Sequence, residues 1–238
     1  MVEPARLFQE EVVEAPVELK LDLLLPVPLR RGTAPLHIAT INGDTWQGAR
    51  TVLEWNAAAG RRFDVAFVQE TRFPDSEAAG GARQWCLGQG CHLALGPPRR
   101  TGAERLAVSG GVGLCIGTHI GVFSGIAVPD EWSHRIVARK IHLGEGSVLL
   151  VISLYMITSI GLTGDNLALL AEVASIVGQF PVPFIIGADW NVDAHDLVAS
   201  DWCQEVDGII VNPGVPTCGD NEYDYFVMSR SLAHHTSH

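Results

Sequence analysis

Apolar and polar residues along the chain follow the spacing of many short strands and few helices. The segment RIVARKIHL (135–143) alternates apolar with polar positions, as a half-buried strand does, and SVLLVISLYM (147–156) is the continuous apolar run of a fully buried strand. The glycine-rich turn between them predicts that the two strands form a hairpin. Apolar residues at helical spacing predict the clearest helix over residues 166–180, capped by Asp165 or Gly164.

The same pattern predicts strands and helices through most of the chain. Because consecutive strands are joined by hairpins, the sheets should be mixed rather than parallel. Two mixed β-sheets flanked by helices make a four-layer α/β sandwich, which is the fold we expect. Further strands are predicted at residues 36–42, 64–70, 91–96, 110–117, 121–128, 208–212 and 223–229 and at the run beginning with Phe184, and further helices at residues 46–59, 77–87 and 194–200.

Residues 1–35 differ in character from the rest of the chain. They combine many acidic residues with the proline-rich stretch LLLPVPLRRGTAPL and show no sustained helix or strand period. We expect a linker or partly disordered arm, in which Leu21–Leu25 is either a short apolar anchor or a lone strand. The globular domain is then expected to cover residues 36–238.

The composition favours a single globular domain. The 238 residues are 47% hydrophobic and 18% charged, which is enough to bury a core. The formal net charge of −11 is unfavourable for binding long nucleic acid. A bound divalent cation would make the charge of the site locally positive, so the net charge does not exclude a nuclease. The five cysteines include no CxxC pair and predict neither a disulfide framework nor a zinc site.

The sequence also predicts where the protein resides. Its N-terminus is too acidic for a secretory signal. The longest apolar run, residues 147–160, is too short to cross a bilayer and is interrupted by polar residues. We therefore expect a soluble intracellular protein of the nucleus or cytoplasm, without a membrane span.

Polar residues capable of chemistry stand at the ends of the predicted strands. In FIIGADWN (184–191), Asp189 and Asn191 follow a buried strand and, being two residues apart, point to the same side. Should the strand ends meet at one rim, these hard oxygen donors suit Mg²⁺ or Mn²⁺ and favour phosphoester hydrolysis, in which a carboxylate activates the attacking water. The other polar residues at or near strand ends are Asn42, Glu70, Tyr155 and Asp224.

Each of these residues also has a purely structural interpretation. Asn42 precedes a glycine in a common turn pair, and Glu70 suits a solvated strand end. Tyr155 suits a core aromatic residue whose hydroxyl is hydrogen-bonded, and Asp224 suits an exposed position between two tyrosines. Taken singly, none of them identifies a site.

Taken in order, the motifs carry more information. The set IATIN, VQE, SLYMI, GADWN and DYFVMS resembles the endonuclease/exonuclease/phosphatase superfamily, which includes abasic-site endonucleases and the endonuclease domains of non-LTR retrotransposons. The resemblance covers residues 36–229. It implies a metal-dependent phosphodiester hydrolase with the four-layer fold predicted above.

The resemblance assigns the metal side of the site to four residues. Glu70 would be the principal ligand of Mg²⁺ or Mn²⁺, and Asn42 would help to position the metal or the phosphate. Asp44 would add a contact through water. Tyr155 would hydrogen-bond the phosphate or the nucleophile.

The resemblance assigns proton transfer and charge stabilisation to residues of the motifs GADWN and DYFVMS. Asp189 would orient or activate the attacking water, and Asn191 would stabilise the developing oxyanion. Asp224 would orient a catalytic histidine on the next loop.

The sequence departs from the family at that histidine. The family closes with a further strand and a Ser-Asp-His-like motif, whereas the tail SRSLAHHTSH offers only His234, His235 and His238. We expect a chain that is truncated or shifted in frame before this motif, with one of the three histidines as a weaker substitute. Loss of the last strand would leave an exposed sheet edge.

Three functions are compatible with these features. The first is a DNA endonuclease, such as the endonuclease part of a mobile-element polyprotein. The second is a phosphatase of small phosphoesters or phosphoinositide head groups, which suits the acidic balance better. The third is a catalytically inactive fragment that only binds a partner. The substrate is thus a nucleic acid or another phosphoester, and the pattern leaves the oligomeric state open.

Overall fold

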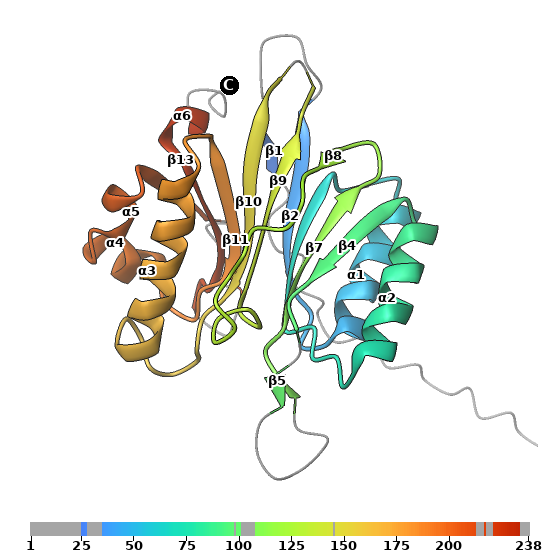
Figure 1. Cartoon of the computed structure of the whole chain (residues 1–238), viewed down its shortest axis with the longest axis horizontal. Helices are drawn as coiled ribbons and strands as arrows, with labels where there is room; N and C mark the ends of the chain where they lie inside the picture. The colour runs from blue at the N-terminus through green and yellow to red at the C-terminus, as the bar shows by residue number, and fades with distance from the viewer. Residues whose placement is uncertain are drawn as a thin grey trace, which may run out of the picture.

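The computed structural model describes residues 25–27, 35–97, 99–100, 108–144, 146–212, 217 and 221–233. Two mixed β-sheets pack face to face at the centre, and helices cover the outer face of each (Figure 1). The predicted four-layer α/β sandwich is therefore confirmed.

The first sheet has the strand order β1-β2-β3-β7-β4 among the described residues. Strands β2 and β3 run parallel, and every other neighbouring pair is antiparallel. Of Leu21–Leu25, the segment predicted to be an anchor or a lone strand, only Leu25 lies among the described residues, and it begins β1, which pairs with β2 at the sheet edge. The strands are β1 (Leu25–Val27), β2 (Leu36–Asn42), β3 (Val65–Gln69), β7 (Val112–Gly117) and β4 (Cys91–Leu95).

The second sheet has the order β12-β13-β11-β10-β9-β8. Strands β10 and β11 are parallel, and β9 and β10 form the predicted antiparallel hairpin. A separate two-stranded ribbon joins β5 (Arg99–Arg100) to β6 (Val108–Ser109). The strands of the second sheet are β8 (Gly121–Val122), β9 (Ile136–His142), β10 (Val148–Tyr155), β11 (Phe184–Asp189), β12 (Gly208–Val211) and β13 (Asp224–Ser229).

The helices lie on the two outer faces of the sandwich (Figure 1). The first pair, α1 (Trp46–Ala58) and α2 (Ser76–Gly88), covers the first sheet, and both begin at a side-chain cap. The second sheet is covered by α3 (Gly164–Gln179), α4 (Ala194–Ala199) and α5 (Trp202–Glu205). The short α6 (Arg230–Ala233) follows β13. No helix in the described part of the chain has both the length and the apolarity needed to span a bilayer.

Three buried clusters of apolar side chains separate the four layers. One lies between α1, α2 and the first sheet, one between the two sheets, and one between the second sheet and α3 to α5. Both faces of the central strands are therefore buried, which explains why β10 and β11 read as continuous apolar runs. The sheets approach closely at Gly187, where a Cβ would lie 2.4 Å from the ring of Phe67.

Two local predictions are wrong. Only Gly121–Val122 of the strand predicted at 121–128 is a strand. Beyond it the chain stays beside β9 through only two described backbone bonds, from the N–H of Phe123 to Lys140 at 2.9 Å and from that of Ile126 to Ala138 at 3.4 Å, and Phe123 is exposed. Gly125 lies in this loop, where a Cβ would be 2.9 Å from Nη1 of Arg139. The N-cap of α3 is Thr163 rather than Asp165 or Gly164, and it makes no side-chain capping bond.

Candidate active site

The strand ends that carry the predicted polar residues meet at one edge of the sandwich. Asn42 ends β2 and Glu70 directly follows β3, the neighbouring parallel strand. Tyr155 and Asp189 are the last residues of β10 and β11 and are paired in register. Asp224, the first residue of β13, pairs with Asp189 from the other side. The sheet registers therefore bring these five residues to a common edge.

Two hydrogen bonds join the sheets at this edge. Nδ2 of Asn42 donates to Oδ2 of Asp189 at 2.7 Å, and the hydroxyl of Tyr155 donates to Oε1 of Glu70. Each bond links a residue of the first sheet to one of the second. Burial and the neighbouring Glu70 carboxylate raise the pKa of Tyr155, so its phenol stays protonated as the donor.

Asp189 accepts bonds on both carboxylate oxygens. While Oδ2 accepts from Asn42, Oδ1 accepts from the backbone N–H of Asn191 at 3.1 Å. The side chain of Asn191 donates from Nδ2 to the carbonyl of Met156 at 3.0 Å, which ties it to the end of β10. Trp190 between them is fully buried and stacks on Tyr225. Asp189 and Asn191 thus face the site while Trp190 anchors the segment in the core.

The carboxyl group of Asp189 is perturbed in a way that suits proton transfer. Its burial and the nearby Asp224 raise the pKa of Asp189 to about 8, because a second negative charge in a desolvated place is unfavourable. A carboxylate with a pKa near the working pH is a general base of useful strength. The environment therefore distinguishes Asp189 from the exposed acids of the surface.

Asp224 is buried at the start of β13, where its backbone N–H donates to Oγ1 of Thr217 at 3.0 Å. Its predicted partner would be a histidine of the tail. His234, His235 and His238 lie outside the described residues, so the role of Asp224 in orienting a histidine remains a prediction.

Backbone strain gathers at this edge. Seven described residues other than glycine have positive φ, and four of them are Asp44 (54°), Glu70 (55°), Arg72 (44°) and Asn191 (48°). Left-handed conformations of this kind cost about 1–3 kcal/mol each and persist where the surroundings enforce them. Their concentration here is typical of a functional site.

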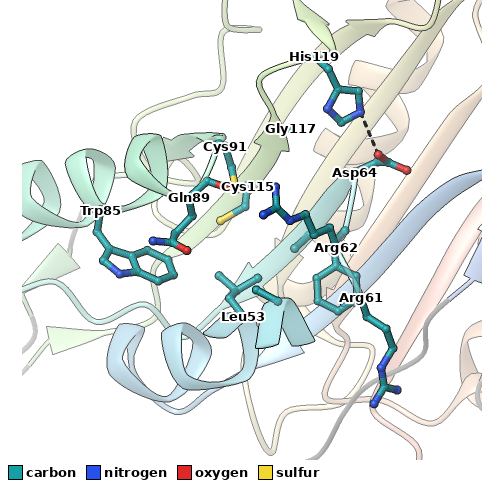
Figure 2. Close-up of a pocket in the computed structure, with 14 residues that line it drawn as sticks. Leu53, Arg61, Arg62, Asp64, Trp85, Gln89, Cys91, Cys115, Gly117 and His119 are labelled. Atoms are coloured by element: carbon teal, nitrogen blue, oxygen red, sulfur yellow. Dashed lines mark hydrogen bonds and ion pairs between the residues drawn. The ribbon is translucent and has the colours of Figure 1, made fainter. Parts of the chain in front are cut away.

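A pocket elsewhere contains none of these residues. It has a volume of about 120 Å³ and lies between α1, α2 and the first sheet, at the beginning of β3 rather than at its end. Figure 2 shows the pairing of His119 with Asp64 at the rim of this pocket, which joins Nε2 and Oδ1 at 3.0 Å. A second recess of about 300 Å³ adjoins the edge with the predicted residues and is lined by Asn191, Tyr223 and neighbouring residues.

Comparison with solved structures settles the fold. An AP endonuclease from Leishmania major superposes with a TM-score of 0.57 and 16% identity, covering 83% of this chain and 80% of that one. A family protein from Leptotrichia buccalis, described as an endonuclease/exonuclease/phosphatase, gives 0.53 and 17% over 81% and 87%. The chain has the endonuclease/exonuclease/phosphatase fold.

A third structure with this fold is the endonuclease domain of TRAS1, a telomere-specific non-LTR retrotransposon. It gives a TM-score of 0.56 and 16% identity, covering 83% of this chain and 86% of that domain. No protein-family model and no curated protein matches the sequence. The likeness therefore lies in the fold, and the roles of individual residues are proposals.

The donor set at the edge of this endonuclease/exonuclease/phosphatase fold fits a divalent cation of the Mg²⁺ type. The available donors are oxygens, chiefly the buried carboxylate of Glu70 and the amide oxygen of Asn42. The described residues hold no group of three His, Cys, Asp or Glu suited to a metal. Mg²⁺ is commonly held by one or two carboxylates, with water and substrate phosphate completing its coordination, so a single carboxylate is sufficient.

Two polar residues beside the site were not predicted. Nη2 of Arg72 donates to Oε2 of Glu70 at 2.6 Å, and Gln69 is fully buried between the sheets. The signal for Arg72 was its position two residues after Glu70, within VQETR. Gln69 offered a weaker signal, a polar residue inside a buried strand.

We expect the titration of Asp189 to appear in the stability of the metal-free protein. Its pKa is about 8 in the folded state, against about 4 for an unfolded chain. Between these values the folded state binds more protons, so the free energy of unfolding falls as pH rises from about 4 to about 8. The fall attributable to Asp189 is on the order of a few kcal/mol.

Urea unfolding in EDTA at a series of pH values measures this effect. Asp189→Asn removes the titration and should flatten the decline over the same pH range. Parallel pH profiles for the two proteins would show that the pKa of Asp189 is not raised.

Proposed function

We propose that the chain is a Mg²⁺-dependent phosphodiester hydrolase that acts as a DNA endonuclease. The observation that carries the proposal is the pair of bonds across the sheets, Asn42 to Asp189 and Tyr155 to Glu70. They gather a metal-binding carboxylate, a candidate base and two neutral donors at one edge. This collection of groups matches the needs of phosphoester hydrolysis by water.

Each residue has a distinct task in this proposal. Glu70 holds the cation, with Asn42 beside it, and Tyr155 fixes the Glu70 carboxylate in place. When bound, the cation neutralises charge on the phosphoryl group. Asp189 takes a proton from the water that attacks phosphorus, and its orientation is set by Asn42 and by the backbone of Asn191.

Stabilisation of charge falls to the amide of Asn191. Its Nδ2 carries two hydrogens, and only one is needed for the bond to the carbonyl of Met156. The other can serve the oxyanion that develops on phosphorus. Asp224, buried beside Asp189, helps to raise the pKa of Asp189 and so makes it a stronger base. Asp224 would also orient a histidine if the tail supplies one.

DNA is favoured as substrate by the proteins that share the fold. An AP endonuclease and a retrotransposon endonuclease domain are among the structural neighbours described above. The formal net charge of −11 predicts weak nonspecific attraction to DNA, so binding should depend on the local site rather than on a basic surface.

The second candidate is a hydrolase of small phosphoesters. It is favoured by the acidic recess beside Asn191, which Asp193 and Asp196 line together with neutral residues. An acidic recess disfavours a phosphate backbone but tolerates a small phosphoester delivered with its cation. Salt separates the two candidates, because DNA cleavage should weaken steeply as salt rises and turnover of a small substrate should not.

Nicking of supercoiled plasmid tests the proposal directly. The full chain should nick the plasmid with Mg²⁺ and not with EDTA, and Glu70→Ala purified in parallel should give only background. Absence of Mg²⁺-dependent nicking would reject the endonuclease. Turnover of p-nitrophenyl phosphate would then indicate the second candidate. Failure of both reactions would indicate a protein that only binds a partner.

A further inference from the structure

The carboxylate of Glu70 is already engaged on both oxygens. Tyr155 donates to Oε1, and Nη2 of Arg72 donates to Oε2 at 2.6 Å. The side chain of Glu70 is 9% exposed and that of Arg72 is 40% exposed. A guanidinium thus occupies the open side of the carboxylate, which is the side a cation from solvent would approach.

The backbone is built to place Arg72 there. Both Glu70 and Arg72 have left-handed φ, so the chain folds back and the two side chains meet although only Thr71 separates them. The N–H groups of Thr71 and Arg72 donate to the carbonyls of Gly111 and Gly110, each at 3.1 Å. A Cβ on Gly111 would lie 2.5 Å from Oγ1 of Thr71, so only glycine permits this close approach. The contact is a product of the folded turn and not of a flexible surface side chain.

We propose that Arg72 is a resident counter-cation of Glu70, which a divalent metal must displace from Oε2 in order to bind. The inference rests on the proposed function, which places the metal at Glu70. Arg72 then sets how tightly the site holds its metal, and it keeps the carboxylate oriented when no metal is bound.

Charge supports competition rather than cooperation between the two cations. A guanidinium and a divalent ion on one carboxylate repel each other at short range, where Coulomb interactions are large. Arg72 also has an alternative partner, because the exposed carboxylate of Asp44 lies close enough to interact electrostatically with its guanidinium. Displacement therefore exchanges one partly exposed ion pair for another and is not prohibitively costly.

Binding of Mn²⁺ to the metal-free full-length chain tests the inference without measuring activity. Electron paramagnetic resonance of free Mn²⁺ gives the Kd for the wild type, Arg72→Gln, Arg72→Lys and Glu70→Gln, with circular dichroism to confirm folding. Arg72→Gln should bind Mn²⁺ about tenfold more tightly at low ionic strength, because it keeps a hydrogen-bond donor and removes the competing charge. Arg72→Lys retains the charge and should stay within about threefold of the wild type.

The outcomes distinguish competition by Arg72 from metal binding at Glu70. If Arg72→Gln binds Mn²⁺ no more tightly than the wild type while Glu70→Gln abolishes binding, the competition proposal is wrong and the metal site at Glu70 stands. If Glu70→Gln binds Mn²⁺ as the wild type does, the metal is not at Glu70 and the proposed function itself loses its metal site. Tighter binding by Arg72→Gln that persists undiminished in about 1 M salt would also contradict competition by charge.

Discussion

Replacing Asp189 by asparagine should lower kcat for Mg²⁺-dependent phosphodiester cleavage about a thousandfold, with a change in KM of less than about threefold. The amide has the shape of the carboxylate, and its one oxygen can still accept from Asn42, whereas its NH2 group then faces the backbone N–H of Asn191 and cannot accept from it. The substitution therefore removes the base together with one of its two orienting hydrogen bonds. An interaction made only in the transition state affects kcat and not KM. Steady-state kinetics on a labelled oligonucleotide duplex measure both.

Asp201→Asn is the matched control for this substitution. Asp201 is an exposed aspartate with left-handed φ, a conformation that asparagine tolerates, and it lies outside the site. Its kcat and KM should equal those of the wild type. A loss of less than about tenfold for Asp189→Asn would mean that the attacking water is activated by another group.

Much of the fold could be predicted because both faces of its central strands are buried. A strand between two layers needs apolar residues at nearly every position, and β10 and β11 show that pattern directly. The prediction was wrong where glycine-rich sequence mimicked it, as in the segment after Val122. There Phe123 is exposed while Ile126 and Val128 are half-buried against the core without forming a strand, and apolar composition alone gave no warning.

The meeting of the candidate residues at one edge could be predicted from the strand ends, but the hydrogen bonds between them could not. Strand ends carrying Glu70, Asp189 and Asn191 are visible in the sequence, and the parallel pairing of strands places them at one edge. The bond between Asn42 and Asp189 spans 147 positions along the chain, and no local pattern encodes it. The contact between Arg72 and Glu70 is local, but it depends on two left-handed residues that sequence spacing does not reveal.

A buried polar network directly beneath the site was equally hidden. The amide of Gln69 accepts from Oγ1 of Thr40 at 3.1 Å and donates to Oγ of Ser153 at 3.3 Å and to the carbonyl of Gly187 at 3.1 Å. The first two residues belong to the first sheet and the other two to the second. The Ser153 hydroxyl in turn donates to the carbonyl of Val68 in β3 at 3.3 Å, so two polar side chains connect the sheets in this layer.

The network is in register with the site. Thr40, Ser153 and Gly187 each stand two residues before a site residue, namely Asn42, Tyr155 and Asp189, and Gln69 directly precedes Glu70. Because side chains two apart on a strand share a face, the network forms the layer below the site on the same inner faces. The amide of Gln69, which directly precedes Glu70, thus bonds to the carbonyl of Gly187, two residues before Asp189.

Gln69→Leu should lower the free energy of unfolding by about 3–6 kcal/mol. Leucine fills a similar space but takes a partner from the Thr40 hydroxyl and the Gly187 carbonyl, while the Ser153 hydroxyl keeps the carbonyl of Val68 as its acceptor. Each buried group left unsatisfied costs about 1–3 kcal/mol. For a domain stable by about 5–15 kcal/mol, this is a large share. Urea unfolding at fixed pH, with the m-value compared between proteins, measures the loss.

The triple variant Thr40→Val, Gln69→Leu, Ser153→Ala shows whether the loss arises from the network. Removing the hydroxyls along with the amide leaves only the carbonyls of Gly187 and Val68 without their side-chain donors, so the triple variant should regain more than half of the stability lost by Gln69→Leu. A loss below about 1 kcal/mol for Gln69→Leu would contradict the network's contribution to stability. If the triple variant regains stability without regaining kcat, an apolar layer is sufficient to hold the sheets together. The polar network of Gln69 would then be needed to hold Glu70 and Asp189 at their working separation.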